Sequence, residues 1–146
     1  MPSETPPLLP GAEPFSAGGG PGGALVLHGF TGSPHSVRGV AQAMAAAGWA
    51  VHAPLLPGHG TSPDDIQATT WDDWRHAAET AWADLSARCD LVVVFGLSMG
   101  GSLAAALEAY RVPVGTMALA DAVAGVSAAI LANQAMAARA SGTRAG

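Results

Sequence analysis

The sequence predicts an α/β protein built on a parallel sheet of about four strands flanked by helices. Four short aliphatic runs alternate with stretches in which apolar residues recur at helical spacing. The expected strands cover residues 24–27, 49–53, 91–95 and 112–119. These runs are mainly apolar on both faces, so helices are expected to cover the sheet on both sides, as in parallel sheets.

Two helices are expected between the first three strands, each opened by a capping residue. Ser33 precedes Pro34, an arrangement typical of an N-cap and first helical position, and the helical pattern continues to residue 47. Thr70 is the expected N-cap of a longer helix over residues 71–88. Tryptophans recur there at helical spacing and predict a stripe that faces the core or lines a groove: Trp71, Trp74 and Trp82.

The most informative segment joins the third expected strand to a helix through Gly-Leu-Ser-Met-Gly. In this strand–turn–helix context, a G-x-S-x-G sequence is typical of a nucleophile elbow, whose sharp turn exposes the serine. Glycine at Gly96 and Gly100 removes side chains that would collide where the strand and the helix come close. Ser98 is therefore the candidate nucleophile, in a backbone conformation that costs about 1–3 kcal/mol.

The composition excludes several classes of protein. A formal net charge of −5 argues against a nucleic-acid surface, and 49% hydrophobic residues favour a packed globular fold. All six basic residues are arginine, so no lysine can form a Schiff base or a P-loop. Cys89 is the single cysteine, which excludes an intrachain disulfide or a cysteine-built metal site. We expect neither a cofactor nor a metal.

Three segments differ in composition. Residues 1–23 are rich in proline and glycine and predict a flexible leader. They lack the basic start and apolar stretch of a secretion signal, so a cytoplasmic location is expected. Residues 24–120 carry the strand–helix pattern. Residues 121–146 form an alanine-rich tail, helical or aberrant, whose polar interruptions argue against a membrane span.

Four linked motifs resemble those of the α/β-hydrolases, and among them the small carboxylesterases and monoacylglycerol lipases. The matching stretches are LVLHGFTGS at residues 25–33, APLLPGHG at 53–60, WDDW at 71–74 and GLSMGG at 96–101. Their order and separations are similar to the family's from residue 24 to about residue 119. The resemblance implies a partial α/β-hydrolase fold, the N-terminal portion of the domain.

The resemblance also implies a chemistry. Ser98 would attack a carboxylic ester and form an acyl-enzyme that water then hydrolyses. Two backbone N–H groups, those of Phe30 and Met99, would stabilise the negative charge that develops on the carbonyl oxygen. The side chains of the same two residues would line an acyl pocket for a small apolar ester.

The other members of a catalytic triad are not identified in the sequence. In this fold an acid and then a histidine follow the serine, but no histidine follows Ser98. Asp121 ends the fourth expected strand, at a position that some lipases use for the acid. His28 and His59 lie in motifs that look like loop-shaping positions in the relatives. We therefore expect a truncated or frame-shifted reading of a longer esterase gene.

Several hypotheses stay open. The chain is a serine ester hydrolase by lineage, or an inactive fragment or pseudoenzyme that acts, if at all, through binding. His59 or His28 is a further candidate for the base, and thioesterases and acyltransferases share the elbow. A sheet edge left open by truncation predicts self-association, because unpaired backbone groups attract further strands.

Overall fold

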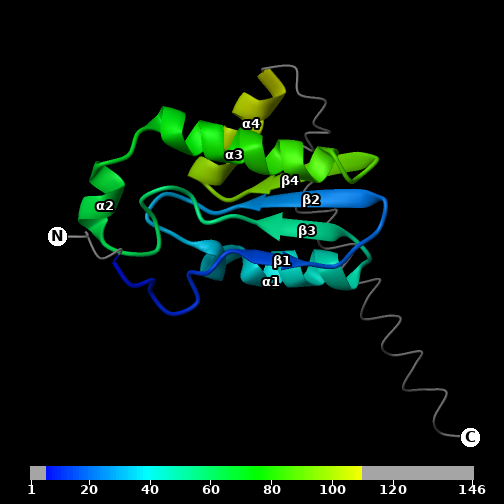
Figure 1. Cartoon of the computed structure of the whole chain (residues 1–146), viewed down its shortest axis with the longest axis horizontal. Helices are drawn as coiled ribbons and strands as arrows, with labels where there is room; N and C mark the ends of the chain where they lie inside the picture. Colours follow the sequence, from blue (N-terminus) through cyan, green and yellow to red (C-terminus); the bar gives the residue numbers. More distant parts are fainter. Residues whose placement is uncertain (1–5, 110–146) are drawn as a thin grey trace, which may run out of the picture.

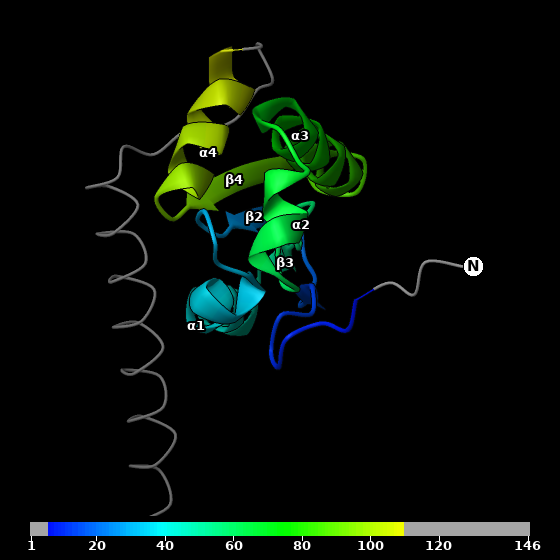
Figure 2. The same ribbon diagram turned by 90° about the vertical axis from the view of Figure 1, so that its left-hand side faces the viewer.

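A β-sheet lies between two layers of helices. The computed structural model describes residues 6–109, in which α1 covers one face of the sheet and α3 and α4 cover the other (Figure 1, Figure 2). The strands are β1 (Phe15–Ala17), β2 (Gly22–Leu27), β3 (Ala50–Ala53) and β4 (Leu91–Gly96). The helices are α1 (Pro34–Ala46), α2 (Pro63–Gln67), α3 (Trp71–Ser86) and α4 (Met99–Ala109). The α/β architecture predicted from the sequence is confirmed.

The strands lie in the order β1-β3-β2-β4. β2 pairs in parallel with both β3 and β4, and its last residue, Leu27, lies opposite Gly96 at the end of β4. The carboxyl ends of these three strands therefore meet at one edge of the sheet. Ligands of open α/β sheets bind at that edge.

Both faces of the sheet are buried, as its aliphatic strands predict. Successive side chains of β2 alternate between two clusters, because a strand points its residues to opposite faces in turn. Leu25 and Leu27 pack on the α3 and α4 side together with Leu103. Ala24 and Val26 pack on the α1 side. Full burial of each large aliphatic side chain contributes about 1.5–3 kcal/mol to folding.

The structure differs from the expectation of a flexible leader over residues 1–23. β1 lies within that stretch and pairs antiparallel with β3, and β2 begins within it. Arg38 of α1 holds this stretch, since its Nη2 donates to Gly11 O at 3.0 Å and to Glu13 O at 3.1 Å. The Arg38 guanidinium also lies 5.4 Å from the centre of the Phe15 ring. These contacts join residues far apart in the sequence, so composition did not reveal them.

The sheet is mixed rather than wholly parallel, because β1 runs antiparallel to β3. The strand expected over residues 112–119 lies outside the described residues, as do Asp121 and the tail over residues 121–146. Within residues 6–109, β4 pairs with β2 alone, so its second edge carries no strand there. Self-association through that edge stays a prediction.

The helices begin at caps that the sequence marks. Thr70 caps α3, because its N–H donates to the Asp73 carboxylate at 2.8 Å while its hydroxyl accepts the Asp73 N–H. The bonds from the Thr70 N–H and hydroxyl lower the pKa of Asp73. The short helix α2 was not expected. The alanine-rich pattern after the turn predicts a helix from Ser102, whereas α4 begins three residues earlier, at Met99. Over the described range, no helix combines the length and the apolar character needed to cross a bilayer.

Candidate active site

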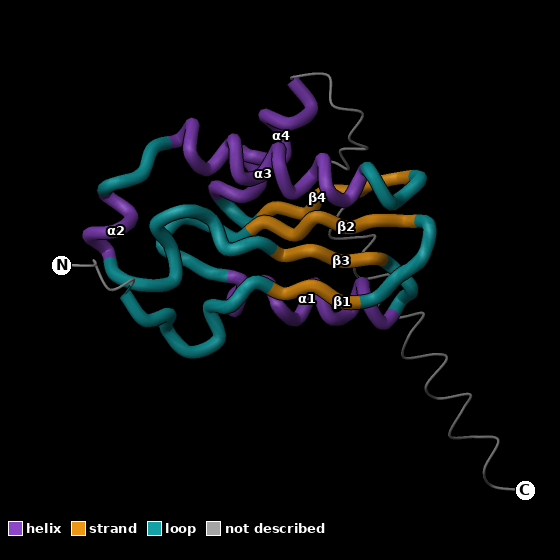
Figure 3. Tube along the Cα trace, viewed as in Figure 1, coloured by secondary structure: helices purple, strands orange, loops and turns teal. Residues whose placement is uncertain are grey.

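The loops that follow β2, β3 and β4 leave the sheet at one edge (Figure 3). Ser98 lies in the last of these loops, just after Leu97, whose N–H donates to Leu27 O at 3.0 Å. Ser98 has a φ of 54°, a left-handed conformation that is uncommon for residues other than glycine. α4 starts at the next residue. The side chain is therefore exposed at a strained bend and does not lie within a helix.

Close approach of backbone requires glycine on both sides of Ser98. A Cβ on Gly100 would lie 2.7 Å from His28 O, closer than real Cβ atoms come. A Cβ on Gly96 would overlap the carbonyl group of Gly100. These two glycines allow β4, α4 and the end of β2 to come together around the serine.

The loop after β2 packs directly against this bend. A Cβ on Gly29 would lie 3.4 Å from Ser98 Cβ and 3.1 Å from Leu97 O. The next residue in the loop is Phe30, and the residue after the serine is Met99. Among the described residues, neither the Phe30 N–H nor the Met99 N–H has a hydrogen-bond acceptor. Two unpaired backbone donors therefore belong to the segments that meet at Ser98.

Thr31, in the same loop, has a backbone strain that sequence reasoning missed. The Gly32 N–H donates to Gly29 O at 3.0 Å and closes a four-residue turn, in which Thr31 has a φ of 61°. The third position of such a type II turn normally holds glycine. Strain of this kind costs about 1–3 kcal/mol and gathers at functional sites. In this protein both segments that meet at the serine are strained, the loop after β2 at Thr31 and the turn after β4 at Ser98 itself.

His28 is fully buried and organises the loop. Its Nδ1–H donates to Gly29 O at 2.9 Å, and its Nε2 accepts the Leu56 N–H at 3.1 Å. Burial lowers the pKa of His28 from 6.5 to about 4, against an opposing effect of the bond to Gly29. Both ring nitrogens are engaged and neither bonds to Ser98, so no contact supports His28 as a base.

His59 belongs to a cluster of three rings with Phe30 and Trp74, here called the aromatic cluster. The centre of the His59 ring lies 6.1 Å from that of Phe30 and 5.5 Å from that of Trp74. Its Nδ1–H donates to Pro57 O at 3.0 Å. Its Nε2 is buried and has no partner in the part of the chain that the structure describes. No hydrogen bond joins His59 to Ser98.

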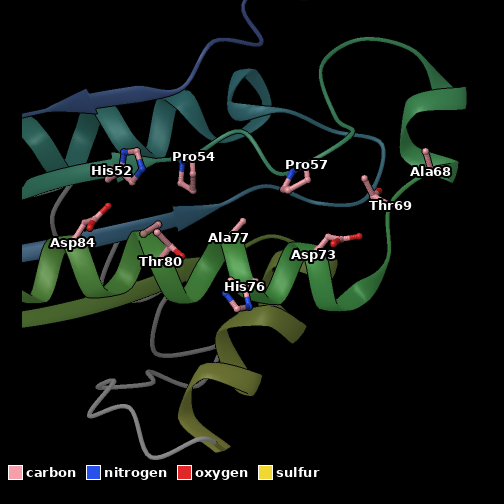
Figure 4. Close-up of a pocket in the computed structure, with 11 residues that line it drawn as sticks. His52, Pro54, Pro57, Ala68, Thr69, Asp73, His76, Ala77, Thr80 and Asp84 are labelled. Atoms are coloured by element: carbon pink, nitrogen blue, oxygen red, sulfur yellow. The ribbon is translucent and has the colours of Figure 1, made fainter. Parts of the chain in front are cut away.

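An open groove with a volume of about 720 Å³ runs between α3 and the end of β3 (Figure 4). Asp84 points across the groove toward His52, and Asp73 lies at the other end (Figure 4). Burial and then Arg88 lower the pKa of His52, while Asp84 opposes them. Ser98 does not line this groove, which is therefore separate from the strained bend.

Large apolar side chains are exposed beside the bend and at the start of α3. The exposed fraction is 55% for Phe30, 45% for Leu97 and 41% for Trp71. Apolar surface of this kind, near a serine and two unpaired donors, suits a ligand with an apolar body and one polar group.

We expect the strained backbone at Ser98 to lower the free energy of unfolding by a measurable amount. Ser98→Gly should raise the free energy of unfolding by about 1 kcal/mol relative to Ser98→Ala, because glycine adopts positive φ without a Cβ clash. Urea unfolding followed by circular dichroism gives both values, and Ser98→Ala controls for loss of the hydroxyl. Equal stabilities of the two variants would show that the bend is unstrained.

The layered fold and the motifs along the sheet edge define the class of protein. A family model described as alpha/beta hydrolase fold matches residues 25–143, and the chain belongs to that family. It is 52% identical over 101 residues to the thermostable monoacylglycerol lipase of Bacillus sp. (strain H-257), a match covering 69% of this chain and 40% of that protein. It is 33% identical over 103 residues to a carboxylesterase of Bacillus subtilis (strain 168), covering 70% and 42%.

A solved structure of a metagenome-derived lipolytic enzyme is also similar. It is 45% identical, with a TM-score of 0.69, and the match covers 72% of this chain and 43% of that one. The chain thus spans about two fifths of the length of the curated relatives it matches. The family expected from the four sequence motifs is confirmed.

Proposed function

We propose that this chain carries the nucleophile and the oxyanion hole of a serine hydrolase that cleaves carboxylic esters. The observation that carries the proposal is the position of Ser98, exposed at a φ of 54° between the end of β4 and the start of α4. The N–H groups of Phe30 and Met99, which have no acceptor within residues 6–109, support it. The relatives named as a monoacylglycerol lipase and a carboxylesterase support an ester as the substrate.

The proposed reaction has two stages. Ser98 Oγ attacks the ester carbonyl carbon, its proton passes to a base, and the carbonyl oxygen becomes an oxyanion. The N–H groups of Phe30 and Met99 donate to that oxygen, and loss of one such donor costs about 2.7–4 kcal/mol of transition-state stabilisation. The intermediate expels the alcohol, which takes up a proton, and leaves an acyl-enzyme. Water then attacks the acyl group, releases the acid and restores the serine hydroxyl.

The base is the missing part of this proposal. No histidine follows Ser98 in the 146 residues, and neither His28 nor His59 is hydrogen-bonded to it. Removal of the base from a serine triad lowers kcat by about a millionfold. We therefore propose that this polypeptide by itself turns over esters very slowly. The proposal assigns the nucleophile and the two donors to this chain and leaves the base unassigned.

The proposed substrate is a small apolar ester. Phe30 and Leu97 expose apolar surface next to the serine. An acyl chain would cover that surface and gain about 25 cal/mol for each Å² of apolar area removed from water. A charged acyl group would lose hydration against this apolar surface, which is costly.

A fluorophosphonate probe tests the proposal on the whole chain. Ser98 Oγ attacks the phosphorus and fluoride leaves, so a covalent adduct reports a reactive serine. We expect labelling over hours that is lost in Ser98→Ala and retained in Ser102→Ala, since Ser102 is also exposed and lies one turn along α4. Added imidazole should speed labelling of Ser98, because it supplies the absent base.

The second candidate function is that of an inactive family member that acts through binding. It is favoured by the two buried histidines nearest to the bend, since neither His28 nor His59 is hydrogen-bonded to Ser98. Folded protein that is not labelled, with or without imidazole, would support this alternative and contradict the catalytic proposal. Labelling that survives Ser98→Ala would contradict the assignment of the nucleophile.

A further inference from the structure

Trp74, one turn into α3, connects two segments that are separate in the sequence. Its indole Nε1–H donates to Pro57 O at 3.0 Å and to Thr69 Oγ1 at 3.1 Å. Pro57 precedes α2 and Thr69 follows it, so one donor ties together both ends of the loop that contains this helix. The side chain is only partly exposed, so these bonds are shielded from competing water.

The same side chain supports the loop beside Ser98. The centre of the Trp74 ring lies 5.8 Å from that of Phe30 and 5.5 Å from that of His59. Trp74 Nε1–H and His59 Nδ1–H both donate to the carbonyl of Pro57. The aromatic cluster is thus anchored at one backbone oxygen. The Phe30 side chain is more than half exposed, so few other neighbours hold it. The ring contacts with Trp74 and His59 therefore restrain its position.

We propose that Trp74 is a positioning residue for the oxyanion hole. Its N–H fixes Pro57 and Thr69, its ring fixes Phe30, and together they set where the Phe30 N–H lies relative to Ser98. This inference rests on the proposed function and adds to it a residue whose hydrogen bonds go to Pro57 and Thr69 and not to the serine. A displacement of about 1 Å at such a donor is enough to slow catalysis substantially.

Trp82 provides the matched comparison on the same helix. It packs against the core cluster on the α3 and α4 side of the sheet. Its Nε1 is buried and has no partner in the described part of the chain. Trp→Phe therefore removes two hydrogen bonds at position 74 and none at position 82, with a similar loss of ring size.

Hydrogen exchange tests the positioning directly. The Gly32 N–H closes the turn that contains Phe30, so its exchange rate reports how often that turn opens. We expect Trp74→Phe to raise this rate about tenfold and Trp82→Phe to leave it unchanged, since one intramolecular hydrogen bond contributes roughly this factor. Equal Gly32 rates in Trp74→Phe and the unsubstituted chain would overturn the proposal.

Substitutions of Thr69 test the hydrogen bond from Trp74 on the acceptor side. Thr69→Val removes the acceptor of the Trp74 bond, together with the bond that the Thr69 hydroxyl donates to Ile66 O at 2.7 Å, whereas Thr69→Ser keeps the hydroxyl. We expect Thr69→Val to speed exchange of the Gly32 N–H and Thr69→Ser to retain the original rate. The double variant Trp74→Phe/Thr69→Val should exchange little faster than Trp74→Phe alone, because Trp74→Phe has already removed the bond between these two side chains. A Gly32 exchange rate in Thr69→Val equal to that of the unsubstituted chain would show that Trp74 does not act through Thr69.

Phosphonylation of Ser98 separates this inference from the proposed function. We expect Trp74→Phe to lower the maximal labelling rate constant about tenfold with little change in probe affinity, a split that a general loss of packing would not give. Trp82→Phe should label as the unsubstituted chain does. If the unsubstituted folded chain is not labelled, the proposed function fails, while the Gly32 exchange rates still decide whether Trp74 positions the loop.

Discussion

Gly96→Ala should prevent stable folding of this chain. The new Cβ would overlap the Gly100 carbonyl and the Gly101 nitrogen, which are backbone atoms at the start of α4 and cannot rotate away. α4 would have to move off the end of β4, and Leu103 and Leu107 of this helix lie in the core. We expect a loss of about 4 kcal/mol or more, which is most of the stability of a marginal domain.

Gly39→Ala is the matched control for this glycine prediction. Gly39 lies in α1, and a Cβ there would meet no heavy atom within 4 Å. Alanine is favoured over glycine inside a helix, so this variant should gain about 0.5–1 kcal/mol. Urea unfolding measured by circular dichroism compares the two variants. A folded Gly96→Ala with stability near that of the unsubstituted chain would contradict the close approach of β4 and α4.

Acid should destabilise the protein below pH 6.5 because of His28. Burial lowers the pKa of His28 from 6.5 to about 4. Between these two values the unfolded chain binds the proton more strongly than the folded chain does, so the free energy of unfolding falls as the pH falls. This contribution is fully present above pH 6.5 and is lost by about pH 4. It amounts to about 3 kcal/mol.

His28→Leu tests this pH dependence, because leucine fills a similar volume and cannot take up a proton. At pH 7 the variant should be less stable by about 1–3 kcal/mol, since the buried Leu56 N–H loses its acceptor. Its stability should depend less on pH between 6.5 and 4. A weaker dependence should remain, because burial also lowers the pKa of His52. Parallel pH profiles for the two proteins would exclude His28 as the main cause.

The elements that could be predicted are those whose signals are local. Thr70 and Asp73 are three residues apart and cap α3 by bonding to each other, so a short stretch of sequence contains the whole interaction. Gly96, Ser98 and Gly100 form a similar local pattern, because strand, turn and helix follow one another without interruption. Boundaries shifted where three-dimensional packing extends an element, as at α4, which begins at Met99.

The features that sequence reasoning missed depend on partners far along the chain. β1 is a strand because it pairs with β3, although its own residues lie in a stretch rich in proline and glycine. Trp74 was expected only as part of a stripe, yet its neighbours in space are Pro57 and Phe30, from two other loops. Thr31 gives no sign of its positive φ, because threonine is rarely found in that conformation.

The sequence by itself determined the α/β class, the caps of the long helices and the glycine-flanked turn around Ser98. Hydrophobic period and steric demand act over a few residues, so they can be recognised without coordinates. Only the tertiary structure decided that β1 joins the sheet, that His28 is neutral and bonded at both nitrogens, and that Trp74 supports Phe30. Each of these three features depends on contacts between segments that are distant in the sequence. Loop closure and the packing of the whole chain determine which of those contacts form.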